Sequence, residues 1–171
     1  PEVTPLPDRM RVREYLSYRS GLKGLYGRRA ESAITRSVER CDLFDVYDSL
    51  IAHLGKGVRQ RVGLADCLLG SPKVLLLDEP LADLDPQHTV QTRDLLSRLD
   101  GVTILLSSQR LHEVQRICKR LLVLHRGRLL ASDTPENIYD RTVDERVINL
   151  ELISPEPVRE TLRAITGVRT V

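Results

Sequence analysis

The sequence has 171 residues, of which 41% are apolar and 29% are charged. This length and balance suit one globular domain with at most a small appendage. The 26 basic and 24 acidic side chains give a net charge of +2, so the composition does not favour nucleic acid as a partner. No apolar run approaches the roughly 18–20 residues that a membrane-spanning helix needs.

The first part of the chain is predicted to be helical. The prolines of residues 1–7 indicate a loop, and Asp8 is placed to cap a helix whose apolar spacing ends at residues 21–27. A second helix is expected over 28–43, and a third over 58–69 after a tight glycine-containing loop at 54–57. The cysteines fall in these and a later helical pattern without metal-ligand spacing, and we expect reduced, buried thiols at Cys41, Cys67 and Cys118.

An alternation of strands and helices follows. Residues 73–78 form a continuous apolar run between turn signals, which predicts a strand buried on both faces. Asp85 followed by Pro86 is a strong helix start. Further strands are expected at 102–106, 121–124 and 129–131, with helices at 110–118 and after Thr134. This order predicts an α/β fold with a largely parallel sheet flanked by helices.

The pattern changes after residue 141. Residues 147–152 alternate strictly between apolar and polar side chains, which predicts a half-exposed strand, and an amphipathic helix is expected at 155–165. We therefore predict a domain at 1–141, with a helical part at about 8–70 and a second part at 73–141. Residues 142–171 are predicted to begin a small α+β C-terminal accessory domain.

Two carboxylates follow the first predicted strand, Asp78 and Glu79. Ligands of open α/β sheets bind at the carboxyl ends of the strands. Asp78 suits contact with Mg²⁺, a cation that prefers oxygen ligands, and Glu79 could orient a water molecule for attack on a γ-phosphate. Taken alone, the pair is equally compatible with ordinary strand-end residues.

The wider order of motifs resolves this ambiguity. A glycine-containing turn and helix precede Leu-Leu-Leu-Asp-Glu-Pro, and Leu-Ala-Asp-Leu-Asp-Pro follows. This order resembles the nucleotide-binding subunits of ABC transporters, whose ATPase domains are of the P-loop NTPase type. In the resemblance, 54–58 stands at the signature loop, 75–79 at the Walker B strand and 82–85 at the D-loop. Gln109, after the strand at 102–108, stands at the switch histidine.

The resemblance implies ATP and Mg²⁺ as cofactors and assigns roles to particular residues. It implies catalytic roles for Glu79 and Gln109, a Mg²⁺ contact for Asp78, and a D-loop role for Asp85. It also implies that the signature loop contacts the ATP of a partner subunit through Gly55, Lys56, Gly57 and Val58.

The sequence departs from the family pattern at two of these positions. Gly55 stands where the family has serine, which removes a hydroxyl donor. Gln109 replaces a histidine, and its amide can donate a hydrogen bond but cannot carry positive charge. Because Asp78 and Glu79 are present, we expect slower hydrolysis rather than none.

No Gly-x-x-x-x-Gly-Lys-Ser/Thr motif occurs in the 171 residues. We expect the Walker A loop and the Q-loop to precede Pro1, so that the chain is a fragment that binds ATP poorly and is inactive on its own. Residues 56–61 and the strand predicted after residue 141 further resemble subunits of drug, polysaccharide or gliding-type exporters.

The resemblance implies an ATP-hydrolysing subunit that dimerises with a second ABC ATPase subunit, identical or not. Hydrolysis would drive export through membrane-spanning permease subunits, from a cytoplasmic position on the inner face of the cell membrane. Two alternatives stay open. One is a catalytically weakened subunit that acts as an ATP-dependent clamp or regulator, and the other is a soluble ABC ATPase that works on ribosomes or DNA.

Overall fold

The computed structural model describes residues 5–142 of the chain. Its contacts divide the chain into two compact units, Pro1–Leu121 and Leu122–Val171. The strand and helix predicted at 147–152 and 155–165 lie outside the described residues, so the accessory domain stays a prediction.

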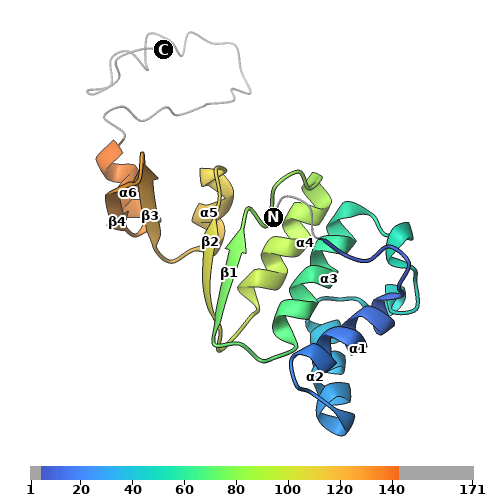
Figure 1. The fold of residues 1–171 in the computed structure, drawn as a ribbon. Helices are drawn as coiled ribbons and strands as arrows, with labels where there is room; N and C mark the ends of the chain where they lie inside the picture. The colour runs from blue at the N-terminus through green and yellow to red at the C-terminus, as the bar shows by residue number, and fades with distance from the viewer. Residues whose placement is uncertain (1–4, 143–171) are drawn as a thin grey trace, which may run out of the picture. The chain divides into compact units, whose positions relative to one another are not determined.

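The first unit begins with a helical part (Figure 1). It consists of α1 (Val12–Leu22), α2 (Gly27–Arg40) and α3 (Lys56–Leu68), with short 3-10 turns at Phe44–Val46 and Ile51–His53. The three helices pack against one another in each pairing. Their apolar stripes meet in a core that includes the fully buried side chains of Val12, Leu16, Leu43, Ile51 and Val62.

The helix starts differ from the prediction in two places. The residue before α1 is Arg11, whose backbone N–H donates to the Glu14 carboxylate at 2.9 Å. Asp8 lies three residues before this N-cap and does not cap the helix; its carboxylate pairs with Arg59 at 2.7 Å. The third helix begins at Lys56 with Gly55 as its N-cap, two residues earlier than predicted, so that Lys56 and Gly57 form its first turn rather than a loop.

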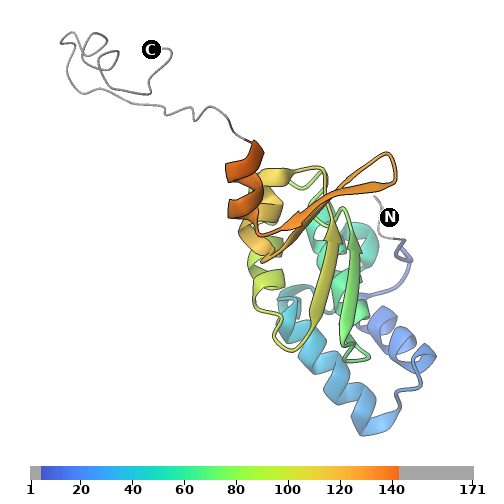
Figure 2. The ribbon, with the colours of Figure 1, turned by 90° about the vertical axis from the view of Figure 1, so that its left-hand side faces the viewer.

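A parallel pair of strands forms the second part of this unit. β1 (Val74–Asp78) leads through α4 (Pro86–Ser97) to β2 (Thr103–Ser107), and α5 (Leu111–Ile117) follows. The register pairs Val74 with Thr103 at one end and Asp78 with Ser107 at the other. Figures 1 and 2 both show the two strands side by side.

The predicted burial of β1 on both faces is wrong for this chain. Leu75 is buried and belongs to the core that α3 and α4 share, with Leu96 of α4 beside it in the same cluster. On the opposite face, Leu76 of β1 is 74% exposed and Leu105 of β2 is 54% exposed. The apolar run correctly indicated a strand, but within residues 5–142 its second face stays open to solvent.

A buried carboxylate connects α1 to α3. Asp66 of α3 is only 7% exposed. It accepts hydrogen bonds from the Tyr15 hydroxyl at 3.1 Å and from Arg19 Nε at 2.8 Å, and Lys23 Nζ lies 3.2 Å from its second oxygen. A buried charge is tolerated when it is paired and hydrogen-bonded in this way.

The cysteines are free thiols in different environments. Cys41 is buried as predicted, and burial raises the pKa of its thiol to about 12. Cys67 is exposed, which corrects the prediction of buried thiols throughout. The helical pattern correctly placed Cys67 in α3 but on the wrong face.

The hairpin β3 (Leu121–His125) and β4 (Arg128–Asp133) lies almost entirely in the second unit, and α6 (Pro135–Thr142) follows it. Arg126 and Gly127 connect the strands with φ angles of 46° and 74°. Positive φ at both central residues is typical of two-residue hairpin turns. Both the hairpin and the helix start after Thr134 agree with the sequence-based expectation.

Candidate functional site

Two carboxylates lie at the carboxyl end of β1, beside the end of β2. The hydroxyl of Ser107 donates to Oδ1 of Asp78 at 2.5 Å. The backbone N–H of Glu79 donates to both the carbonyl and the hydroxyl oxygen of Ser107, each at 3.2 Å. Asp78 is exposed and Glu79 is half-buried, so one serine on the neighbouring strand holds two carboxylate-bearing residues at an accessible edge.

This edge offers oxygen ligands only. The Asp78 carboxylate and the Ser107 hydroxyl are the kind of donors that Mg²⁺ prefers. Among the described residues there is no group of three or more His, Cys, Asp or Glu side chains placed to hold a metal ion. The Asp78 carboxylate could hold Mg²⁺ together with phosphate and water oxygens, which is the usual pattern for this ion.

The backbone changes direction sharply after β1. Glu79 and Asp83 are non-glycine residues with φ angles of 44° and 52°. Such left-handed conformations cost about 1–3 kcal/mol each and are common at functional sites. The carbonyl of Glu79 accepts from the N–H of Ala82 at 3.0 Å, which closes the first turn of the segment 79–85.

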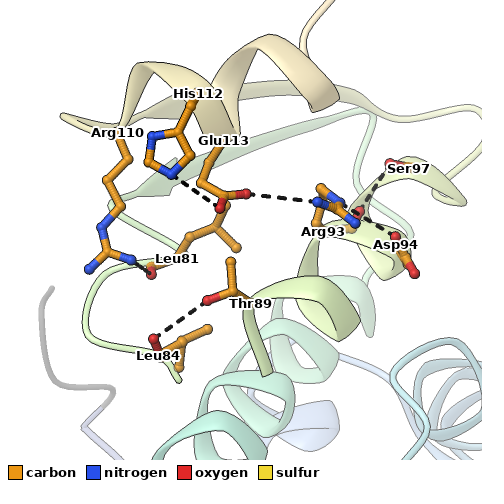
Figure 3. A network of polar contacts seen from close by, with 9 residues as sticks. All are labelled: Leu81, Leu84, Thr89, Arg93, Asp94, Ser97, Arg110, His112 and Glu113. Atoms are coloured by element: carbon orange, nitrogen blue, oxygen red, sulfur yellow. Dashed lines mark hydrogen bonds and ion pairs between the residues drawn. The ribbon is translucent and has the colours of Figure 1, made fainter. Parts of the chain in front are cut away.

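Polar contacts fix the segment 79–85 from the side of α4 and α5, as Figure 3 shows. The Arg110 guanidinium donates to the carbonyl of Leu81 at 3.5 Å, and the Thr89 hydroxyl donates to the carbonyl of Leu84 at 3.5 Å. Arg93 of α4 lies 4.0 Å from the carboxylate of Glu113 on α5. The loop after β1 is thus anchored to the two helices that follow β1 and β2.

The same segment is also connected to the start of α3. Lys56 Nζ lies 3.1 Å from Oδ2 of Asp83. The side-chain amide of Gln60, one turn further along α3, donates to the carbonyl of Pro80 at 3.4 Å. The predicted signature loop and D-loop are therefore neighbours within one chain.

Asp85 caps α4, as the sequence predicts. Its Oδ1 accepts from the backbone N–H of His88 at 2.9 Å, and its Oδ2 lies 2.6 Å from His88 Nδ1. The backbone N–H of His88, and then its ring, lower the pKa of the Asp85 carboxyl. His88 also packs on the start of α3, where a Cβ on Gly57 would lie 2.2 Å from His88 Cδ2.

The two departures from the family pattern lie in open surroundings. A Cβ on Gly55 would meet no other atom within 4 Å, so crowding does not enforce glycine at this N-cap. Gln109 is exposed and lies two residues after β2. The nearby His112 has a side chain 74% exposed and lies 3.4 Å from Glu113, so it is a surface residue.

The structure thus groups the predicted site residues into two clusters. Asp78 and Glu79 meet at the strand ends, where Gln109 follows β2. Lys56 connects the signature positions to the D-loop at Asp83, Gly57 lies against His88 of α4, and Val58 packs against the helical core. Sequence reasoning missed Ser107, whose pairing with Asp78 depends on strand register.

Sequence reasoning also gave His88 no specific role. Its spacing of three residues from an N-cap aspartate was the available signal, because this spacing brings the side chain back toward the cap.

Among residues 5–142, no helix has the length and apolar character required to cross a membrane.

Comparison with known proteins identifies the family of the chain. A family profile described as "ABC transporter" matches residues 2–82. The Nod factor export ATP-binding protein I of Burkholderia orbicola is 32% identical over 168 residues, which cover 96% of this chain and 55% of that protein. The daunorubicin resistance ATP-binding protein DrrA2 of Streptomyces coeruleorubidus is 34% identical over 72% of this chain and 39% of its own length.

Solved structures show the same fold. The structure of cbiO1 from Clostridium perfringens, part of the ABC transporter complex cbiONQ, matches with a TM-score of 0.72 and 25% identity, over 80% of this chain and 55% of that one. An ATP-binding subunit of an ABC transporter matches with a TM-score of 0.67 and 27% identity, over 82% and 60%.

The described residues are therefore part of an ABC ATPase domain of the P-loop NTPase type. The chain belongs to the family of ABC transporter ATP-binding proteins. It spans about half the length of the curated relatives that it matches.

Proposed function

We propose that the whole protein hydrolyses Mg-ATP as one of two ATPase subunits that power export through membrane-spanning partners. The observation that carries this proposal is the cluster at the strand ends, where Ser107 holds Asp78 and the backbone of Glu79. Such a pair of accessible carboxylates, at the carboxyl edge of a parallel sheet, is suited to metal-assisted phosphoryl transfer.

Each residue of this cluster has a distinct role in the proposal. Glu79 orients and polarises the attacking water, for which its carboxylate is partly accessible to solvent. Asp78 holds Mg²⁺ directly or through water, and Ser107 fixes the orientation of that carboxylate. The ion, when bound, neutralises charge on the phosphate oxygens.

The signature loop is proposed to face the nucleotide of the second subunit. α3 is 13 residues long and its N-cap, Gly55, provides no side-chain hydrogen bond to the first turn. The N–H groups of this turn and the helix dipole are suited to an anion such as a γ-phosphate. Lys56 adds a positive charge beside them, although it also pairs with Asp83.

A weakened subunit that acts as an ATP-dependent clamp is the second candidate. Gly55 lacks the hydroxyl of the family's serine although space for a side chain is present. Gln109 lacks the charge that a protonated histidine would bring to the phosphate. Both departures are expected to slow hydrolysis more than ATP binding, and hydrolysis at a reduced rate is the outcome we favour.

The transport role draws on the relatives. The names of the proteins from Burkholderia orbicola and Streptomyces coeruleorubidus refer to Nod factor export and daunorubicin resistance. We propose that the protein lies on the cytoplasmic face of the membrane, bound to a membrane-spanning permease that exports a substrate, and we do not favour a role on ribosomes or DNA.

The test is the steady-state Mg-ATPase rate of the whole protein and of two matched variants. Glu79→Gln keeps the shape of the side chain but removes the carboxylate, so turnover should fall at least about a hundredfold. Glu31→Gln makes the same change at an exposed position of α2 and should leave the rate unchanged. Equal rates for Glu79→Gln and the unmodified protein would refute the catalytic assignment.

A further inference from the structure

His88 lies between the two segments that carry the proposed signature loop and D-loop. Its Nδ1 is 2.6 Å from Oδ2 of Asp85, at the end of the D-loop. The other edge of its ring lies against the first turn of α3, where a Cβ on Gly57 would be 2.2 Å from Cδ2 and 2.4 Å from Cγ. The His88 side chain is 30% exposed, so most of the ring is enclosed by these contacts.

The ring and the glycine fit each other tightly. A real Cβ does not approach another heavy atom to 2.2 Å, so any side chain at position 57 would displace the ring or the helix. Conversely, removal of the ring would leave a gap opposite Gly57, because the glycine has no side chain to fill it. The His88 side chain is thus one of the contacts that set the distance between the starts of α3 and α4.

The same ring fixes the rotamer of Asp85. An ionised carboxylate can only accept hydrogen bonds, so Nδ1 is the donor. One carboxylate oxygen takes the backbone N–H of His88 and the other takes the ring. The hydrogen bond from the backbone N–H of residue 88 survives any substitution except proline. The hydrogen bond from the ring is lost unless the new side chain places a donor near the position of Nδ1.

We propose that His88 is a positioning residue, which holds the D-loop aspartate and the signature helix in the fixed relation that the two-subunit reaction requires. This inference rests on the proposed function. The other described links at this point are the pair of Lys56 and Asp83, whose side chains are 48% and 70% exposed, and the hydrogen bond from Gln60 to the carbonyl of Pro80 at 3.4 Å. The solvated ion pair contributes little rigidity, and the packed ring adds a further constraint at the first turn of α3.

The experiment uses three single variants of the whole protein. His88→Ala removes the ring but leaves the backbone cap of Asp85. His88→Asn places an amide N–H and a second small atom near the positions of Nδ1 and Cδ2, so it should restore both contacts. His53→Ala removes an exposed histidine from the turn Ile51–His53 and is the matched control.

The first readout is hydrogen exchange of residues 59–64 of α3 in the protein without nucleotide, which depends on the contact and not on hydrolysis. Exchange should become at least about threefold faster in His88→Ala and should stay at the original rate in His88→Asn and His53→Ala. Unchanged exchange in His88→Ala would overturn the positioning role.

The second readout is ATP-driven dimerisation in a Glu79→Gln background, and kcat and KM are measured in the same His88 variants with Glu79 intact. His88→Ala should weaken dimerisation and lower kcat by about tenfold while ATP binding to the single subunit is retained, and His88→Asn should recover both. Normal dimerisation and kcat in His88→Ala would contradict the inference. If exchange responds as expected but no variant hydrolyses ATP, the proposed function fails and the contact itself stands.

Discussion

Ser107 and Asp78 are register partners at the last pair of the parallel strands, and the serine hydroxyl donates to the carboxylate. Ser107→Ala removes this donor and leaves the carboxylate free to rotate. We expect kcat for Mg-ATP to fall about three- to tenfold and the Mg²⁺ requirement to rise.

Ser107→Thr keeps the hydroxyl and should stay near the original rate. Ser97→Ala, which removes an exposed hydroxyl that donates to the carbonyl of Arg93 on α4, is the control. Titration of the ATPase rate with Mg²⁺ measures these effects. A Ser107→Ala protein with an unaltered Mg²⁺ dependence would show that the contact does not orient Asp78.

Two glycines that are two residues apart, Gly55 and Gly57, should respond in opposite ways to substitution. Gly57→Ala places a methyl group against His88 and should destabilise the protein by about 1–3 kcal/mol, the usual cost of overpacking. Gly55→Ser meets no neighbouring atom and provides an N-cap hydroxyl, so stability should stay the same or rise by a few tenths of a kcal/mol. Urea unfolding of both variants decides this, and equal losses at the two positions would contradict the packing.

The hydrogen bond between Tyr15 and Asp66 predicts a dependence of stability on alkaline pH. Burial, and then the charge of Asp66, raise the pKa of Tyr15 from 10.0 to about 12. Because the pKa of Tyr15 is raised in the folded state, its protonated hydroxyl stabilises the protein fully below pH 10. This stabilisation is lost as the pH rises toward 12.

Tyr15→Phe lacks this ionisation but also lacks the hydrogen bond. At pH 8 the variant should be less stable by about 0.5–1.5 kcal/mol, and the difference should shrink between pH 10 and pH 12. Denaturant unfolding across this range gives the two curves. A difference in stability between the two proteins that widens above pH 10 would contradict a raised pKa of Tyr15.

The sequence was most informative where local chemistry decides the structure. Asp85 followed by Pro86 predicted the start of α4, and the positive-φ turn at Arg126 and Gly127 lies between the predicted hairpin strands. At α3 the glycine at position 57 suggested a loop, but it lies in the first helical turn, where the absence of a side chain leaves room for His88.

Contacts between distant segments were not predictable in the same way. The pairing of Ser107 with Asp78 follows from strand register, and the packing of His88 on Gly57 follows from the approach of α4 to α3. Neither of these two contacts gives rise to a recognisable spacing of residues in the sequence. At Asp8 a local signal was misleading. The sequence suggested that this residue caps α1, but the N-cap is Arg11 and the Asp8 carboxylate pairs with Arg59.

The two departures from the family pattern predict a gain of function on reversal. Gly55→Ser restores a hydroxyl at the signature loop, and Gln109→His restores a group that can carry positive charge. Each should raise the ATPase rate of the whole protein, and the double variant should exceed either single variant. Because both contacts act in one transition state, the effects need not add.

Steady-state rates of the four proteins measure this prediction. In a dimer of identical subunits every site gains both groups, whereas in a mixed dimer the gain depends on which subunit supplies each element. A double variant no faster than the unmodified protein would mean that Gly55 and Gln109 do not limit hydrolysis.

The central claim is that Glu79 completes a site which closes only between two subunits. Light scattering of the whole Glu79→Gln protein, with and without Mg-ATP, tests it most directly. The account predicts a single subunit without nucleotide and a stable dimer with ATP, since binding is retained and turnover is blocked. In a mixed dimer the second subunit must be included. A Glu79→Gln protein that keeps the same mass with and without ATP would contradict the account.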